Sequence, residues 1–142
     1  MTFLTRDMLA ENPPVLREEI VPVMWQDAAG AVHRAQVRVM ELTVAEKTTF
    51  ESQAGILAAS SPNDEDVDQA ARLIRQCLVI ASARDESRQP IWTYDDIEYL
   101  SGLGSGLIEP IVNAASRLSN FTEKDLAELG KNSAATGDES SS

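Results

Sequence analysis

The chain has 142 residues, of which 43% are apolar, and its 23 acidic residues outnumber 12 basic ones, giving a formal net charge of −11. This length and composition predict one globular domain whose core needs neither a disulfide nor a metal. The negative charge argues against nucleic acid and anionic lipid as partners, because both are bound through Lys and Arg. No apolar run approaches the roughly 20 residues of a membrane span. Met1–Ala10 lacks a signal-peptide pattern, so we expect a cytoplasmic protein.

The N-terminal third predicts an arm followed by a β-hairpin. Residues 1–14 contain two adjacent prolines, which disfavour a helix before them, and we expect an N-terminal arm. Residues 15–42 alternate as two antiparallel strands around the turn sequence Asp27–Gly30. Pro22 has no N–H to donate, which predicts that the first strand lies at a sheet edge. One side of this strand is formed by Glu19, Val21, Val23 and Trp25.

Residues 43–130 predict the helical part of the domain. Three sequences of the capping-box type begin at Thr43, Thr93 and Thr122. With the three- and four-residue spacing of apolar side chains, they predict helices over residues 44–53, 67–81, 94–100, 107–118 and 122–130. The predicted fold class is therefore α+β, mainly α-helical with about five helices after an N-terminal antiparallel hairpin. Residues 131–142 lack large apolar side chains and predict a disordered tail.

Reactive residues are few and do not form a catalytic pattern. His33, the only histidine, lies in a predicted strand, where a hydrogen-bonded or surface role is more common than catalysis. Cys77, the only cysteine, falls within the most regular apolar stripe and predicts an inert buried thiol. Asp64–Asp68 has calcium-loop spacing but lacks the required glycine and terminal glutamate. Gly102–Gly106 follows a helix, not a strand, which argues against a phosphate loop. We therefore expect no enzyme, cofactor or metal.

The remaining features favour binding to another protein. The predicted edge strand can pair with a strand of a second chain, through Val21, Val23 and Trp25. Trp92 lies in a loop, and tryptophan is enriched in interface anchors, although packing in the core is its more common role. The sequence thus predicts Val21, Val23, Trp25 and Trp92 as partner-binding candidates and also predicts self-association.

Several segments occur in an order and at a spacing that characterise a known family. They are Leu42-Thr43 with the capped helix that follows, Ala71–Val79, Trp92–Leu100, Ile111–Thr122 and Asp125-Leu126. Together they span roughly residues 37–129. This part of the chain resembles the tail assembly chaperones of long-tailed bacteriophages. The arm of residues 1–14 and the glycines of residues 102–106 depart from that pattern.

The resemblance implies a protein without enzymatic activity that binds the tape measure protein and keeps it soluble while the tail tube protein polymerises around it. Such a chaperone acts in the host cell cytoplasm, self-associates, is absent from the mature virion and often has a second, longer form made by frameshifting. The alternative is a small structural component of the virion, such as a head–tail connector. A third class, a hydrolase that uses Cys77 or His33, would require a reactive native thiol.

Overall fold

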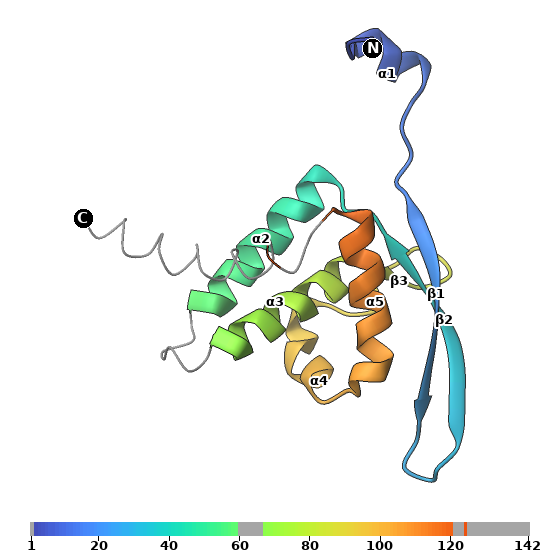
Figure 1. Cartoon of the computed structure of the whole chain (residues 1–142), viewed down its shortest axis with the longest axis vertical. Helices are drawn as coiled ribbons and strands as arrows, with labels where there is room; N and C mark the ends of the chain where they lie inside the picture. The colour runs from blue at the N-terminus through green and yellow to red at the C-terminus, as the bar shows by residue number, and fades with distance from the viewer. Residues whose placement is uncertain (1, 60–66, 121–123, 125–142) are drawn as a thin grey trace, which may run out of the picture.

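The structure is a computed structural model that describes residues 2–59, 67–120 and 124 of the chain. Within them, a three-stranded antiparallel sheet is combined with the α-helices α1 to α5 (Figure 1). This confirms the predicted α+β class with an N-terminal hairpin. No helix in the described ranges has the length and apolar character to cross a membrane.

The sheet has the strand order β1-β2-β3. β1 (Glu18–Gln26) and β2 (Val32–Met40) form the predicted hairpin. β3 (Ala83–Arg84) pairs with the other edge of β2, in a segment for which the sequence predicted only a loop. Two residues are too few to give a periodic pattern, so this strand depends on β2 as its template. β1 lies at the edge, as Pro22 predicted.

The position of Pro22 follows from the hydrogen-bond register of the hairpin. At its two ends, Glu41 donates to the carbonyl of Arg17, and Asp27 donates to the carbonyl of Ala31. Because hydrogen-bonded pairs alternate along an antiparallel ladder, the odd-numbered residues of β1 bond to β2. Even-numbered residues therefore direct their backbone groups to the free edge. Pro22 costs the hairpin no hydrogen bond and removes one donor from the middle of the free edge.

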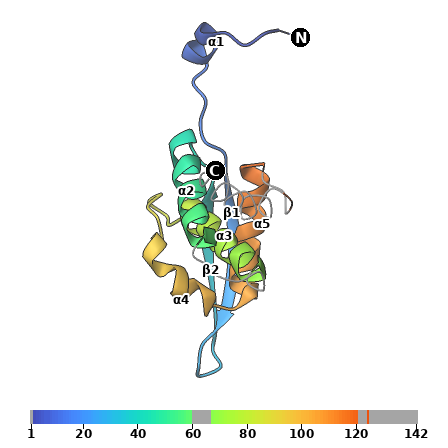
Figure 2. The same ribbon diagram turned by 90° about the vertical axis from the view of Figure 1, so that its left-hand side faces the viewer.

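One face of the hairpin forms a wall of the hydrophobic core. Its buried side chains are Val21, Val23, Val37 and Val39. α5 (Ser105–Leu118) packs across this face, and α3 (Val67–Ser82) packs against α5. Figure 1 shows all helices except α1 gathered on one side of the β1–β2 ribbon, and both views show the hairpin tip extending past them (Figures 1 and 2). The helix predicted over residues 67–81 is confirmed by α3.

The helix α2 (Val44–Ala59) is longer than predicted. The sequence indicated an end near Gly55, because glycine commonly closes a helix in a left-handed conformation. Gly55 does not have a positive φ, and α2 continues through it. Phe50 and Ala54 are fully buried in the core on the α2 side that contacts α3. Tertiary packing thus outweighs the cost of glycine in a helix, which is about 1 kcal/mol relative to alanine.

The short helix predicted over residues 94–100 is present, with an irregular start. It opens as a 3₁₀ turn, Tyr94–Asp96, and continues as α4 (Ile97–Ser101). The predicted capping box is confirmed, because Thr93 N–H donates to the Asp96 carboxylate at 2.8 Å and the Thr93 side chain accepts from the backbone of Asp96. Aspartate therefore replaces the usual glutamate in this box.

The start of α5 differs from the prediction. Pro110 was expected within the first turn of a helix that begins near Leu107, because proline cannot donate to the preceding turn. The helix begins at Ser105, so Pro110 lies beyond its first turn. The carbonyl that loses its donor belongs to Gly106, an exposed residue, and water can satisfy it.

The N-terminal arm contains a helix that the sequence did not predict, α1 (Arg6–Glu11), capped by Thr5 through a hydrogen bond from Met8 N–H. The arm extends away from the rest of the structure (Figure 1). The predictions for the acidic segment 64–66, for most of the helix 122–130 and for the tail 131–142 lie outside the described residues.

Candidate partner-binding site

A pocket open to solvent lies where α2, the end of α3 and the segment after β3 meet. Its volume is about 370 Å³. Its apolar lining residues are Ile80, Ala81, Pro90, Trp92 and Tyr94. The polar residues at the pocket include Glu46, Thr49 and Arg84. We call it the Trp92 pocket. A concave, mainly apolar surface with a few polar groups is typical of a binding site for an apolar side chain.

The loop after β3 positions the aromatic residues of the Trp92 pocket. The Asp85 carboxylate accepts hydrogen bonds from the backbone N–H groups of Ser87 and Gln89, at 2.8 and 3.0 Å. Arg88 adopts a positive φ of 65° within the turn. The chain then returns to form a bridge between Pro90 and Arg84. A short, internally bonded turn thus places Trp92 and Tyr94 beside the end of α3.

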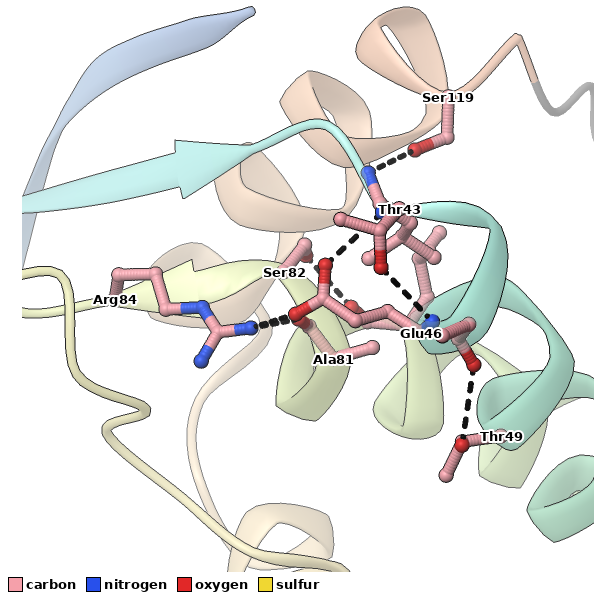
Figure 3. Close-up of polar contacts among 10 residues, drawn as sticks. Thr43, Glu46, Thr49, Ala81, Ser82, Arg84 and Ser119 are labelled. Carbon is pink, nitrogen blue, oxygen red and sulfur yellow. Dashed lines mark hydrogen bonds and ion pairs between the residues drawn. The ribbon is translucent and has the colours of Figure 1, made fainter. Parts of the chain in front are cut away.

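One polar residue of the Trp92 pocket, Glu46, has a carboxylate that is shared between a helix cap and an ion pair. Figure 3 shows these contacts of Glu46. Glu46 and Thr43 form a reciprocal capping box at the start of α2, each backbone N–H donating to the other side chain at 3.0 Å. The second oxygen of Glu46 accepts from Arg84 Nη2 at 2.5 Å, and the same nitrogen donates to the Ala81 carbonyl. Glu46 therefore joins α2 to the end of α3 and to β3.

The pocket also raises the pKa of an aromatic hydroxyl. Burial, with a smaller effect of negative charge on Cys77 and Glu46, raises the pKa of Tyr94 to about 12, and Arg84 opposes this. Burial likewise raises the pKa of the Cys77 thiol to about 12. Both groups are neutral and weakly reactive near neutral pH. The chemistry of the pocket is therefore that of contact and hydrogen bonding.

The two residues considered for catalysis lie in different environments. Cys77 is fully buried in α3, as predicted. His33 is exposed on β2, where Nε2 lies 2.7 Å from Asp27 Oδ2 and the ring stacks on Trp25, with centroids 5.4 Å apart. The hydrogen bond from His33 helps to hold the pKa of Asp27 below its ordinary value. Among the residues that the structure describes, no three His, Cys, Asp or Glu side chains form a potential metal site.

The four predicted partner-binding residues differ in burial and do not form one site. Val21 and Val23 are 5% and 6% exposed, so their side chains belong to the core and are not available to a partner. They were predicted because they lie on an edge strand, but their side of that strand is the one on which α5 packs. Trp25 is 41% exposed near the hairpin tip, where its ring stacks on His33. Trp92 is half-buried, packs against the core and lines the pocket.

The sequence did not single out Glu46, Arg84 or Tyr94 as parts of a site. Glu46 was identified only as a helix cap, and the second role of its carboxylate required the contact with Arg84, 38 residues further along the chain. Nothing in local sequence signals a contact at that separation.

Comparisons with protein-family models, with curated proteins and with solved structures found no match to this chain.

Removal of the Glu46 side chain is expected to destabilise the fold. Glu46→Ala deletes a helix cap and leaves the Arg84 guanidinium, whose side chain is only 14% exposed, without its carboxylate. We expect a loss of about 2 kcal/mol in the free energy of unfolding, measured by urea denaturation. Glu51→Ala on the same helix breaks an exposed pair with Lys47 and should cost at most about 0.5 kcal/mol. Equal losses in the two variants would contradict the shared role of Glu46.

Alkaline pH is expected to destabilise the protein through the two buried neutral groups. Cys77 and Tyr94 have native pKa values of about 12, against reference values of 9.0 and 10.0. The unfolded chain therefore releases these protons first, so stability is fully present below pH 9 and falls between pH 9 and 12. Urea midpoints measured across this range should decline less steeply in Cys77→Ala than in the wild type. Parallel slopes would show that the thiol does not contribute.

Proposed function

We propose that this protein is a tail assembly chaperone of a long-tailed bacteriophage, which binds the tape measure protein and keeps it soluble until the tail tube protein polymerises around it. The observation that supports this function best is the Trp92 pocket, an open and mainly apolar depression whose two charged residues, Glu46 and Arg84, are paired with each other. Such a pocket favours an apolar side chain of another protein over a small reactive substrate.

The surface charge supports the same function. A tape measure protein is long, largely helical and apolar, so it aggregates when its apolar face is exposed to water. A partner that contributes apolar contacts and adds a charge of −11 keeps the complex soluble through mutual repulsion. The chaperone acts without catalysis, in the host cell cytoplasm, and leaves before the virion is complete.

A small head–tail connector of the virion is the alternative function. It is supported by the exposed hairpin tip, because a projecting β-ribbon with an exposed Trp25 can insert between neighbouring subunits of a ring. The two functions differ in where the protein is found at the end of assembly. A chaperone is released, whereas a connector stays in the particle.

Co-expression with the tape measure protein of the same phage tests the proposal. Thr49 and Thr48 are adjacent exposed residues of α2, and each hydroxyl donates to the carbonyl four residues earlier. Only Thr49 lines the Trp92 pocket, so Thr49→Arg fills the pocket while Thr48→Arg is the matched control. We expect the wild type and Thr48→Arg to keep the tape measure protein in the soluble fraction, and Thr49→Arg to lose at least half of that effect.

Mass spectrometry of purified virions completes this test. The chaperone function predicts that the chain is absent from the particles. Stoichiometric retention in the virion would establish the connector instead. A tape measure protein that stays insoluble beside the wild-type chain would contradict the chaperone function directly.

A further inference from the structure

In the structure the N-terminal arm runs through residues 2–16, two residues further than predicted, and it carries apolar side chains that its own chain does not cover. α1 has no buried residue, and among the described residues its hydrogen bonds stay between Thr5 and Asn12. The exposed apolar residues of the arm are Phe3, Leu4, Met8, Leu9, Val15 and Leu16. Apolar side chains in this number on one short segment are a feature of interaction surfaces.

A second uncovered apolar surface lies on the hairpin. The even-numbered side chains of β1 point away from α5, and the register places them beside the even-numbered side chains of β2. We call this the outer sheet face. Its exposed residues are Ile20, Pro22, Met24, Val32, Arg34 and Gln36. No part of the chain described here buries these side chains.

The charges of the two surfaces are complementary. On the outer sheet face, Arg38 is paired with Glu18, whereas Arg34 has no ion pair within the described residues. The arm offers Asp7 and Glu11, which are one helical turn apart on the same side of α1. Neither carboxylate has an ion pair within the described ranges. With Arg6 included, the arm combines apolar groups with a net charge of −1, and the outer sheet face combines apolar groups with Arg34.

The direction of the arm favours a neighbouring molecule over its own sheet. Arg17, at the base of the arm, is held by hydrogen bonds to the Glu41 carboxylate and to the Leu118 carbonyl. Pro13 and Pro14 keep the connection to α1 extended. Figures 1 and 2 show α1 and the hairpin tip at opposite ends of the molecule. When two ribbons lie antiparallel, however, the arm of each copy lies beside the hairpin tip of the other.

We propose that two copies of this chain form a dimer by exchanging their N-terminal arms, each arm packing on the outer sheet face of the other copy. The arm and the outer sheet face together supply about twenty residues from each copy, which is the size of one side of a stable interface. Pro22 removes a donor from the free edge of β1, so the dimer uses the face of the ribbon and not a continuous sheet across two β1 strands. The inference does not depend on the tail assembly function.

Light scattering on the full chain tests the dimer. We expect twice the mass of the 15.5 kDa chain. Leu9→Glu places a charge among the apolar residues of the arm and should weaken dimerisation by at least about tenfold. Val44→Glu, at an exposed position on α2 outside the proposed interface, is the control and should keep the wild-type mass. Thermal melts show whether the variants keep their fold, which is expected because both positions are exposed. A monomer at every concentration of wild type would overturn the proposal.

Disulfide trapping identifies the contact. Because Cys77 is buried, an introduced cysteine is the reactive thiol of the native chain. Mixing Leu9→Cys with Met24→Cys should give a linked pair of chains, whereas mixing Leu9→Cys with Ile56→Cys, an exposed position on α2, should not. A disulfide formed within one chain of a Leu9→Cys/Met24→Cys double variant, in a monomer, would show that the arm folds back on its own sheet and would overturn the exchange.

Discussion

The packing of α5 on one face of the β1–β2 ribbon is the constraint on which the rest of the structure depends. A two-stranded hairpin is marginal alone, and its valines are buried only because a helix covers them. Covering one face leaves the other exposed, since all helices except α1 lie on a single side of the ribbon (Figure 1). The same packing leaves the hairpin tip beyond the helices (Figure 1), and Trp25, near this tip, is 41% exposed. The exposed surfaces of the molecule are thus consequences of how its core is closed.

The junction between the end of β2 and the start of α2 is the second feature that stabilises the fold. Leu42 N–H donates to the Ser119 hydroxyl at 3.4 Å, and the next residue, Thr43, caps α2 together with Glu46 (Figure 3). Glu46 in turn binds Arg84, which lies in β3 directly after α3. The C-terminal ends of β2, α3 and α5 are therefore held close together in space. The Trp92 pocket lies against this junction. Its shape is therefore set by groups that also stabilise the fold, and a ligand meets a pre-formed surface, which lowers the entropic cost of binding.

Much of the fold could be predicted from local sequence, and the errors have physical causes. The hairpin, its edge position and the helix α3 follow from alternation, Pro22 and regular apolar spacing, and all three are confirmed. The end of α2 was wrong because packing around Phe50 carries the helix through Gly55. The site was less predictable. Trp92 was predicted as a partner-binding candidate and lines the pocket. Val21 and Val23 were predicted as such candidates too but are buried, because alternation shows that a strand has two faces and not which of them is covered.

The central claim is that the protein holds an apolar segment of a partner in the Trp92 pocket by contact alone. The chain has two tryptophans, so a ¹H–¹⁵N NMR spectrum contains two separate indole signals. We expect titration with a soluble apolar helical segment of the tape measure protein to shift the indole signal of Trp92 in a saturable way and to leave that of Trp25 in place. A response confined to Trp25, or no response of either indole, would contradict the claim.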